Sequence, residues 1–367
     1  MINNVKKLTV KYNQRIVGYL AETEPHVIGF QYDDEWLTDG FSLSPFSLPL
    51  REEIFYSKKP FFEGLFGVFW DSLPDGWGEL LVIRHLSQQG INYHNLSPLT
   101  KLSIIGKNGL GGLSYEPCQN ADDYVDNFDL DKISLEVDKV LNDTESVFDL
   151  DNIYRLGGSS GGARPKAHVR IDNDEWIIKF PCRLDPVDIG KNEYHANLVA
   201  CKCGIHVNEF KLFPSKLYDG FFGAKRFDRN GENRVHMISL AAILETTHRT
   251  PNLDYIHLFQ VIQMICDKQA DLYEAFRRMC FNVYYGNKDD HGKNFAFLYD
   301  ENIKGYTLSP AYDLTRTRYL AEHQMTVNGN GNPTDEDFIF VAKKFGMNIA
   351  RCKKIIAHIR QIIEKEN

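Results

Sequence analysis

The stretch Gly286-Asn287-Lys288-Asp289-Asp290-His291-Gly292-Lys293-Asn294 decides how the fold of this chain is interpreted. It lies between an apolar helical pattern and the strand-like run Phe295-Ala296-Phe297-Leu298. So many charged and amide side chains between two apolar segments are typical of a solvated turn. They also suit a polar site, because Asp289 can accept a proton from a hydroxyl group and Asn294 can offer an amide oxygen to a hard cation.

The spacing of these residues favours the site over the turn. Asp289 and Asn294 form D-x-x-x-x-N, the pattern of the protein-kinase catalytic loop, in which the aspartate takes the substrate proton and the asparagine holds magnesium. The His-Arg pair that precedes that aspartate is absent, and Asp313 stands where Asp-Phe-Gly is expected but lacks the phenylalanine and glycine. We predict Asp289, Asn294 and Asp313 as catalytic residues, with Asn294 and Asp313 as ligands of Mg²⁺, which prefers hard oxygen donors.

Four further polar residues have other interpretations. Asp290 is the fallback base if Asp289 does not serve. Imidazole is a poor ligand for magnesium, so His291 is predicted to orient the loop at the nucleotide site. Asp71 and Asp75 stand in a tight turn after an aromatic stretch, and turn formation is sufficient to explain both.

A glycine-rich loop covers residues 157–166, upstream of the catalytic stretch. Glycines let backbone N–H groups approach phosphate oxygens, since no Cβ holds the backbone away. The loop matches neither G-x-x-x-x-G-K-[ST] nor G-x-G-x-x-G, so a plain surface loop is the alternative. The loop residues predicted to bind the nucleotide are Gly158, Ser159, Ser160, Gly161, Gly162, Ala163 and Lys166.

A lysine and a glutamate complete this order of parts. Lys179 interrupts the apolar strand 176–180 with a long cation that can reach phosphates, and the alternative is an outward-facing strand lysine. Glu193, early in the next predicted helix, is a weaker candidate as its partner, because a glutamate there is ordinarily a surface charge. Along the chain, the glycine-rich loop comes first, then Lys179 and Glu193, and finally the three predicted catalytic residues. This is the order in which the corresponding parts occur in a kinase.

The composition excludes several protein classes. The chain has 367 residues, 43% hydrophobic and 25% charged, which is ordinary globular usage. Its net charge of −8 argues against direct nucleic-acid binding by the surface as a whole. Seven cysteines without a C-x-x-C pair argue against a disulfide framework or zinc ribbon and favour the cytoplasm. Neither a signal peptide nor an apolar run of about 18 residues is found, so we expect no membrane association.

Local patterns predict two hairpins and two helices. Residues 5–20 alternate in polarity and turn at Asn13-Gln14, and a second hairpin over 167–180 is expected to turn at 172–175. Helices are predicted at 77–86 and at 190–203, the second of them stopping at Gly204.

Other patterns concern boundaries and helix ends. The polar, acidic stretch 119–131 is the best candidate for a domain boundary. Asp271 with Glu274 predicts a capping box at a helix start. The isoleucine stripe over 355–363 predicts a terminal helix docked on the core, with a partner-binding helix as the alternative.

Taken together, these motifs resemble the HipA-like serine/threonine kinases, the toxin halves of bacterial toxin–antitoxin pairs, over nearly the whole chain. Phe41-Ser42-Leu43-Ser44, the 66–77 stretch and Gly109–Tyr115 look like that family's N-terminal subdomain. The loop 162–166, the Lys179 strand, Lys225-Arg226-Phe227-Asp228-Arg229, the catalytic stretch and 309–313 look like its nucleotide loop, phosphate lysine, lobe hinge, catalytic loop and metal aspartate.

The resemblance implies an α+β, two-lobed kinase-like fold with a β-rich N-terminal subdomain and a helical C-terminal lobe. Its expected domains are an N-terminal HipA-like subdomain (1–118), a small lobe with the glycine-rich loop (133–229) and a helical catalytic lobe (230–367). The cofactors would be ATP and Mg²⁺, with Lys225 and Phe227 on the hinge side of the nucleotide. Lys225 departs from the acidic residue that can occur there.

The resemblance also implies partners and self-regulation. The N-terminal subdomain would contact a HipB-like DNA-binding antitoxin, through which alone the chain would reach DNA. The substrate would be a protein serine or threonine, for which family analogy points to a translation factor such as an aminoacyl-tRNA synthetase. Autophosphorylation of a glycine-loop serine would silence the enzyme; Ser159 is the better match by position and Ser160 the alternative. Two rival hypotheses are a non-catalytic, antitoxin-binding corepressor and a kinase of small-molecule hydroxyls.

Overall fold

The computed structural model describes residues 2–24, 27–57, 60–119, 128–142, 150–158, 160–317 and 319–366. The chain divides into two compact units. Unit 1 comprises Met1–Lys191, Phe210–Ile238 and Ala242–Thr246, and unit 2 comprises Asn192–Glu209, Ser239–Ala241 and Thr247–Asn367. The predicted domain limits stay predictions, and each unit is described by itself.

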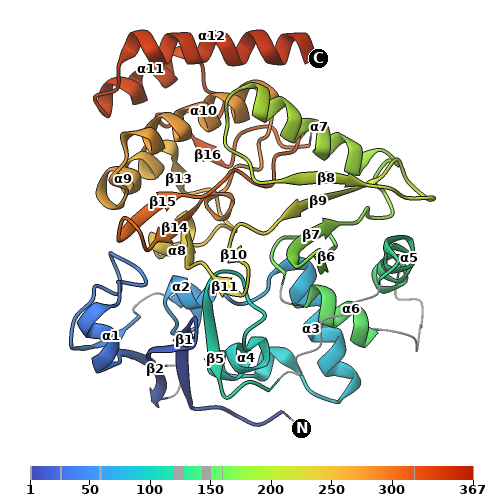
Figure 1. The fold of residues 1–367 in the computed structure, drawn as a ribbon, viewed down its shortest axis with the longest axis vertical. Helices are drawn as coiled ribbons and strands as arrows, with labels where there is room; N and C mark the ends of the chain where they lie inside the picture. The colour runs from blue at the N-terminus through green and yellow to red at the C-terminus, as the bar shows by residue number, and fades with distance from the viewer. Residues whose placement is uncertain are drawn as a thin grey trace. The chain divides into compact units, whose positions relative to one another are not determined.

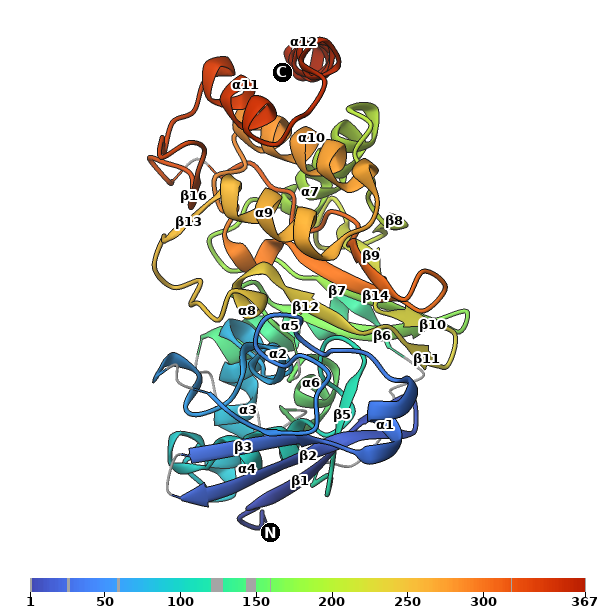
Figure 2. The same cartoon turned by 90° about the vertical axis from the view of Figure 1, so that its left-hand side faces the viewer.

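Unit 1 contains an antiparallel sheet of order β4-β3-β2-β1-β5. Its strands are β1 (Lys7–Tyr12), β2 (Arg15–Glu24), β3 (Val27–Tyr32), β4 (Ile54–Tyr56) and β5 (Leu113–Glu116). Asn13 and Gln14, both at positive φ, form the turn between β1 and β2, which confirms the first predicted hairpin. Figure 2 shows β1, β2 and β3 side by side in this sheet.

A second antiparallel sheet of unit 1 has the order β6-β7-β9-β8. Its strands are β6 (Lys166–Ile171), β7 (Asp174–Lys179), β8 (Phe210–Phe213) and β9 (Phe221–Lys225). The second predicted hairpin is confirmed, but its turn is shorter than expected. Asp172 and Asn173 alone take positive φ, as a two-residue turn demands, so Asp174 and Glu175 belong to β7.

Helices α1 (Asp34–Asp39) and α4 (Pro98–Ile105) pack against the first sheet of unit 1, and α6 (Leu150–Gly157) packs against the second. The other helices are α2 (Gly67–Trp70), α3 (Gly76–Gln88) and α5 (Leu130–Leu141), with 3-10 turns at Pro60–Phe62 and Tyr93–Asn95. The helix predicted at 77–86 is α3. Its buried residues Trp77 and Leu81 belong to the same core cluster as Trp176 and Ile178 of β7, so α3 packs against the second sheet.

Unit 2 is mainly helical and holds most of α7 (Ile189–Lys202). The other helices are α9 (Tyr255–Ile265), α10 (Gln269–Tyr285), α11 (Asp335–Lys344), α12 (Ile349–Glu366) and a 3-10 turn, η3 (Gly292–Asn294). Strands β14 (Ala296–Asp300) and β15 (Gly305–Leu308) form an antiparallel pair, and β13 (Leu253–Asp254) runs parallel to β16 (Met325–Thr326). Short elements near the unit boundaries are β10 (Arg229–Asn230), β11 (Asn233–Arg234), β12 (Met237–Ser239) and α8 (Leu240–Ile243).

Two predictions for helices in unit 2 are confirmed. Helix α7 covers residues 190–202 of the predicted 190–203 segment, and Gly204, at φ +75, lies two residues beyond its end. The isoleucine stripe buries Ile356, Ile359 and Ile363 of α12, which packs against α10 and α11 (Figure 1). The terminal helix is therefore docked on the core of unit 2.

The predicted capping box at Asp271 and Glu274 is wrong. Helix α10 starts earlier, after Lys268, so Asp271 already lies in its first turn. Glu274 instead accepts hydrogen bonds from the backbone N–H of His206 and from Nε of Arg278. A capping box requires its first residue to precede the helix, whereas Asp271 is the third residue of α10.

Among the described parts of the chain, no helix combines the length and apolar character needed to cross a bilayer.

Candidate active site

The catalytic stretch begins where α10 ends at a left-handed glycine, Gly286, whose N–H bonds the carbonyl of Asn282. Asn287 is buried and tied to the same residue, through its backbone N–H to the carbonyl (2.8 Å) and its Nδ2 to Oδ1 (3.0 Å). These bonds turn the chain out of the helix and set the direction of the residues that follow. The 3-10 turn η3 then leads into β14.

The two adjacent aspartates have opposite environments. The side chain of Asp289 is 42% exposed, whereas that of Asp290 is fully buried. Asp290 accepts hydrogen bonds from the Tyr255 hydroxyl (2.8 Å) and Nδ1 of His323 (2.8 Å), and from the backbone N–H groups of Gln324 (3.0 Å) and Met325 (3.3 Å). A carboxylate occupied by four donors anchors the loop and has no access to a substrate. This disfavours Asp290 as the fallback base.

Asp289 lies near the other two predicted catalytic residues. Partial burial raises the pKa of its carboxyl group, the charge of His291 lowers it, and the charges of Asp313 and Asp290 raise it further. The Nδ2 of Asn294 donates a 2.7 Å hydrogen bond to the backbone carbonyl of Asp289. Asp289, Asn294 and Asp313 therefore belong to one polar cluster in unit 2.

The donor groups of this cluster fit a magnesium ion. Because Nδ2 of Asn294 is bound to a carbonyl, its Oδ1 is the atom left to face a cation, and Asp313 adds a carboxylate. Both are hard oxygen donors, and magnesium completes its shell with water and phosphate oxygens. Within the described residues, no group of three or more His, Cys, Asp or Glu side chains is arranged to hold a metal. The two oxygen donors of Asn294 and Asp313 suit an ion whose other ligands are water and phosphate oxygens.

His291 caps the 3-10 turn. Its Nδ1 accepts a hydrogen bond from the backbone N–H of Lys293 (3.3 Å), and its Nε2 lies 4.0 Å from Oδ1 of Asp289. The ring also lies against that of His248, with centroids 5.2 Å apart. These contacts hold the imidazole ring in place at the start of the 3-10 turn, and its role in orienting the loop stays a prediction.

The glycine-rich loop packs against the N-terminus of α3 within unit 1. The backbone N–H of Trp77 donates to the carbonyl of Gly162 (3.0 Å), and the indole N–H donates to the carbonyl of Lys166 (3.1 Å). In return, the N–H of Gly162 donates to Oδ1 of Asp75. Lys166 closes the loop by donating from Nζ to the carbonyl of Gly161, while Gly162 and Ala163 are exposed.

Asp75 is the functional candidate that sequence reasoning missed. The turn interpretation explained its position but not its contact with the loop, which is 87 residues away. The signal in the sequence that could have indicated this role is a carboxylate directly before Gly76 and Gly78 at the start of a helix. Asp71, by contrast, is buried, in agreement with a structural role.

Of the two loop serines, Ser159 lies outside the described residues. Ser160 is fully buried, and its Oγ donates to the carbonyl of Gly157 (2.6 Å). The N–H of Gly158 bonds the carbonyl of Tyr154 (2.7 Å) and continues α6 into the loop.

The three lysines predicted for the nucleotide site, Lys166, Lys179 and Lys225, lie on the second sheet of unit 1. Lys179 of β7 stands opposite Lys166 of β6, with its Nζ 5.8 Å from the ring centroid of Phe222. Lys225 forms an ion pair with Asp174 (2.7 Å). Phe227 is half-buried, and Glu193 is 3% exposed on the part of α7 in unit 2. The convergence of Lys179 with Glu193 and the polar cluster stays a prediction.

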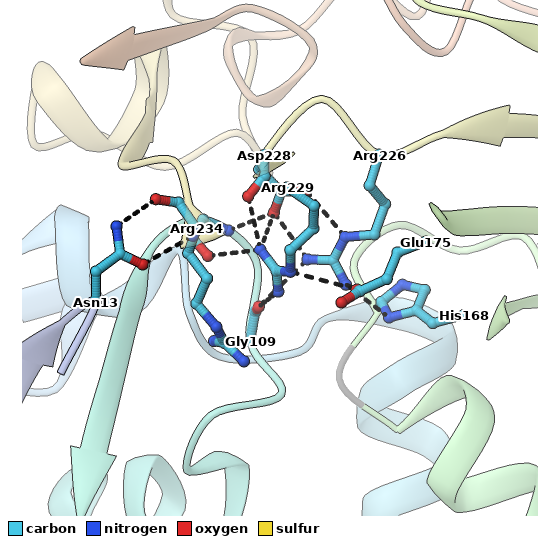
Figure 3. Close-up of polar contacts among 9 residues, drawn as sticks. Asn13, Gly109, His168, Glu175, Arg226, Asp228, Arg229 and Arg234 are labelled. Carbon is cyan, nitrogen blue, oxygen red and sulfur yellow. Dashed lines mark hydrogen bonds and ion pairs between the residues drawn. The ribbon is translucent and has the colours of Figure 1, made fainter. Parts of the chain in front are cut away.

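The hinge segment after Lys225 forms a buried ion network (Figure 3). Arg226 binds both oxygens of Asp228 (2.9 and 2.7 Å), and Nη1 of Arg229 lies 3.0 Å from Oδ2. The N–H of Gly111 donates to the same Oδ2 (2.7 Å), and Glu175 pairs with both arginines (3.3 Å each). Burial raises the pKa of Asp228, but the two guanidinium groups outweigh this and hold it far below its usual range.

Comparisons with known proteins show which family the chain resembles. The family model of the HipA-like C-terminal domain matches residues 158–366, and that of the HipA N-terminal domain matches residues 8–116. Two curated relatives come from Sinorhizobium fredii. "Putative kinase Y4mE" is 25% identical over 85% of this chain and 78% of its own length, and "Putative kinase Y4dM" is 30% identical over 43% and 41%.

A solved structure shares the fold. It is that of the Shewanella oneidensis MR-1 toxin–antitoxin system HipA, HipB and its operator DNA complex, in which the matching chain superposes with a TM-score of 0.73 at 18% identity. The match covers 98% of this chain and 89% of that one. The predicted α+β, kinase-like fold class is thereby confirmed. With family models matching both its N-terminal and C-terminal parts, the chain belongs to the HipA family.

Proposed function

We propose that this chain is an ATP- and Mg²⁺-dependent protein serine/threonine kinase of the HipA toxin type. The observation that carries the proposal is the polar cluster of unit 2. A half-exposed aspartate stands beside an amide and a second carboxylate in a D-x-x-x-x-N loop, while its neighbour Asp290 is fully occupied. The kinase names of the two relatives support the same reaction.

Each residue of the cluster has a part in this proposal. ATP supplies the transferred phosphoryl group, and magnesium neutralises the charge of its phosphates. Asp289 accepts the proton of the substrate hydroxyl as the new O–P bond forms and the bond to the ADP oxygen breaks. Asn294 and Asp313 would hold the metal, and Lys179 with the backbone of 158–166 would bind phosphates. Lys225 and Phe227 would border the adenine.

The regulatory serine is part of the same proposal. Ser160 is buried and bonded to Gly157, so its phosphorylation requires the loop to leave the N-terminus of α3. A phosphate adds about −1.5 to −2 charges, which would keep the loop from returning to a phosphate-binding position. Ser159 is the other candidate.

We also propose a DNA-binding antitoxin of the HipB type as partner and a cytoplasmic translation factor as substrate. The HipA–HipB–operator DNA structure supports the antitoxin, because its HipA chain shares this fold. The same HipA–HipB–operator DNA structure also favours a second candidate function, in which the chain has no kinase activity and acts as a corepressor together with its antitoxin.

Transfer of radiolabelled phosphate from ATP to proteins of a cell extract tests the proposal. Asp289→Asn should reduce labelling by about 10²- to 10⁴-fold, the usual effect of losing a general base, with ATP affinity and melting temperature maintained. Glu301→Gln, an exposed acid after β14, is the matched control and should label like the wild type.

Three outcomes separate the alternatives. Full labelling by Asp289→Asn would refute the base assignment. A wild-type protein that binds no ATP but co-purifies with a DNA-binding protein would favour the corepressor. Label found only in small molecules would identify a metabolite kinase.

A further inference from the structure

A buried histidine–aspartate pair lies directly beside the proposed catalytic base. The side chains of His323 and Asp290 are 3% and 0% exposed, and Nδ1 of His323 lies 2.8 Å from Oδ2 of Asp290. Because a carboxylate only accepts hydrogen bonds, Nδ1 is assigned as the nitrogen that carries the proton and donates the hydrogen bond. The proposed reaction does not use this histidine, although it binds the residue that directly follows Asp289.

One short segment supplies most of the donors around Asp290. Of the four hydrogen bonds that this carboxylate accepts from described residues, three come from the consecutive residues 323–325. Besides Nδ1 of His323, the backbone N–H groups of Gln324 and Met325 donate to Oδ1 (3.0 and 3.3 Å). The fourth comes from the hydroxyl group of Tyr255, which shares Oδ2 with the imidazole (2.8 Å). The imidazole is thus the group through which this segment binds Oδ2.

The same segment also binds the residue on the other side of Asp289. The N–H of Gln324 lies 3.0 Å from the carbonyl oxygen of Lys288, and Nζ of Lys288 donates to the carbonyl of Ala321 (2.6 Å). The segment 321–325 therefore holds both neighbours of Asp289. Because consecutive Cα atoms are about 3.8 Å apart, fixing both neighbours leaves the backbone of Asp289 little freedom. The place of its carboxylate thus depends on this segment.

The segment is itself fixed to the core of unit 2. Met325 and Thr326 form β16, which pairs in parallel with β13. Asp254 of β13 accepts hydrogen bonds from Oγ1 of Thr326 (2.6 Å) and from the N–H of Gly329 (2.8 Å), and it also caps the start of α9. The chain that carries the imidazole therefore has a fixed support.

We infer that His323 is a positioning residue for the proposed phosphoryl transfer: by holding Asp290, it fixes the carboxylate of Asp289 where the substrate hydroxyl group must meet it. This role rests on the proposed function and adds a residue to its site. His323 is buried, so it acts through Asp290 rather than by contact with a substrate. Because its segment follows Asp313 in the sequence, the pair joins the loop of the proposed base to the chain that leaves the proposed metal ligand.

Substitutions at position 323 test this role, because they change one donor and leave Asp289 itself unaltered. His323→Leu removes the donor, so Oδ2 of Asp290 loses one of its two donors among the described residues. His323→Asn keeps an amide N–H donor that is as many bonds from the backbone as Nδ1. His358→Leu, at an exposed position of α12, is the matched control.

The first measurement is the rate of label transfer from radiolabelled ATP to proteins of a cell extract. A misplacement of about 1 Å can cost about 10²-fold in rate, so His323→Leu should lower the rate at saturating ATP about tenfold to hundredfold. The KM for ATP should stay within about twofold of the wild-type value, because nucleotide binding is not affected. His323→Asn should recover most of the rate, and His358→Leu should match the wild type.

A second variant covers the case in which His323→Leu does not fold. His323→Gln keeps a polar side chain, but its amide stands one bond farther from the backbone than Nδ1. It should lose at least about threefold in rate at saturating ATP, with the same unchanged KM for ATP.

Hydrogen exchange followed by mass spectrometry gives a readout that does not depend on activity. The amide groups of residues 286–294 should exchange at least about threefold faster in His323→Leu than in the wild type, because the loop opens more often once Asp290 has lost a donor. The amide groups of α12 should exchange as in the wild type. A general loss of stability would instead accelerate exchange in both segments.

The outcomes separate this role from the kinase proposal. An unchanged rate in the variants lacking the donor, a loss that His323→Asn does not repair, or faster exchange in α12 as well as in the loop would overturn the role of His323 and leave the kinase proposal standing. A wild type that labels no protein would refute the kinase proposal. Exchange would then decide alone: unchanged exchange of residues 286–294 in His323→Leu would overturn the positioning of the loop by His323, and faster exchange confined to these residues would support it.

Discussion

At the scale of single residues, burial divides two adjacent aspartates between two tasks. Asp290 has four hydrogen-bond donors around it and anchors the loop to Tyr255 and His323. Asp289 keeps a partly exposed carboxylate whose pKa is raised by burial and by Asp313. A raised pKa makes a carboxylate a better base, because it binds a proton more strongly at the moment of transfer.

This environment predicts the pH dependence of the reaction. A protonated Asp289 cannot accept a proton, so kcat/KM should rise with pH through the pKa of Asp289, above the ordinary value of about 3.9. His291→Asn keeps an acceptor for the N–H of Lys293 but removes the ring charge that lowers this pKa, so the midpoint should move to higher pH. Initial rates across pH measure it.

His358→Asn, an exposed position on α12, is the control and should leave the profile unchanged. A midpoint at the ordinary carboxyl value, or a shift to lower pH in His291→Asn, would contradict the assignment of Asp289 as base.

At the scale of elements, the glycine-rich loop depends on a helix from a distant part of the chain. The start of α3 approaches the loop so closely that a Cβ at Gly78 would lie 2.2 Å from the carbonyl oxygen of Ser160. Asp75 and Trp77 add hydrogen bonds to Gly162 from the same helix start. The loop conformation is therefore set by α3 as much as by its own glycines.

Replacing Gly78 by alanine should disturb the loop but not the helix. Alanine favours a helix by about 1 kcal/mol over glycine, whereas the added methyl group must push Ser160 away. We expect the dissociation constant for Mg²⁺-ATP, measured by calorimetry, to rise at least about tenfold while the protein still melts cooperatively.

Ser87→Ala, on the exposed end of the same helix, should bind the nucleotide like the wild type. Unaltered affinity in Gly78→Ala would show that nucleotide binding does not require this loop conformation.

At the scale of the whole molecule, the ion network of Figure 3 joins parts of unit 1 that are far apart in the sequence. Asp228 bonds Gly111 and Arg226, and Asn13 bonds Arg234 on both sides of its amide (2.9 and 2.8 Å). Segments from the family's N-terminal and C-terminal domain models thus share one buried network.

Removing the central charge of this network should strongly destabilise unit 1. Asp228→Asn leaves two buried arginines short of a counter-charge, and breaking a buried pair costs about 3–5 kcal/mol. Lys225→Met removes the partly exposed pair with Asp174 and should cost less than about 1 kcal/mol. All four tryptophans lie in unit 1, so urea unfolding followed by their fluorescence reports on it. Equal stability losses in the two variants would contradict the network's importance.

Buried histidines predict how the stability of unit 1 depends on pH. Burial lowers the pKa of His236 to about 4, although its hydrogen bond to Leu43 opposes this. The unfolded chain, with a histidine pKa near 6.5, then binds more protons between pH 4 and 6.5, so stability is complete above pH 6.5 and falls as pH decreases. At 1.36 kcal/mol per pH unit, the loss is about 3 kcal/mol.

The same fluorescence measurement at several pH values checks this. Buried His168 acts in the same direction, and the depressed pKa of Asp228 adds losses only below about pH 4. His236→Gln should flatten the slope between pH 4 and 6.5, and an unchanged slope would exclude His236 as its source.

The features that the sequence alone determined are either local or consist of motifs in a particular order along the chain. Alternating polarity and turn residues placed both hairpins, helical spacing placed α3, α7 and α12, and the order of motifs identified the family. These features depend on few other residues, because a two-residue turn or an apolar helix stripe is set by residues close to it in the sequence. The sequence interpretation was wrong about the length of the turn at 172–175 and about the capping box at Asp271, which lies inside α10.

Only the tertiary structure decided which polar groups are engaged. Nothing in the pair Asp289-Asp290 shows that Tyr255 and His323 enclose the second carboxylate and leave the first beside Asn294. Asp75 at the glycine-rich loop and Ala321 beside Lys288 likewise depend on contacts between segments many residues apart. Burial and charge, which set the proton affinity of a carboxylate, arise from atoms that packing brings together, and a linear motif cannot specify them.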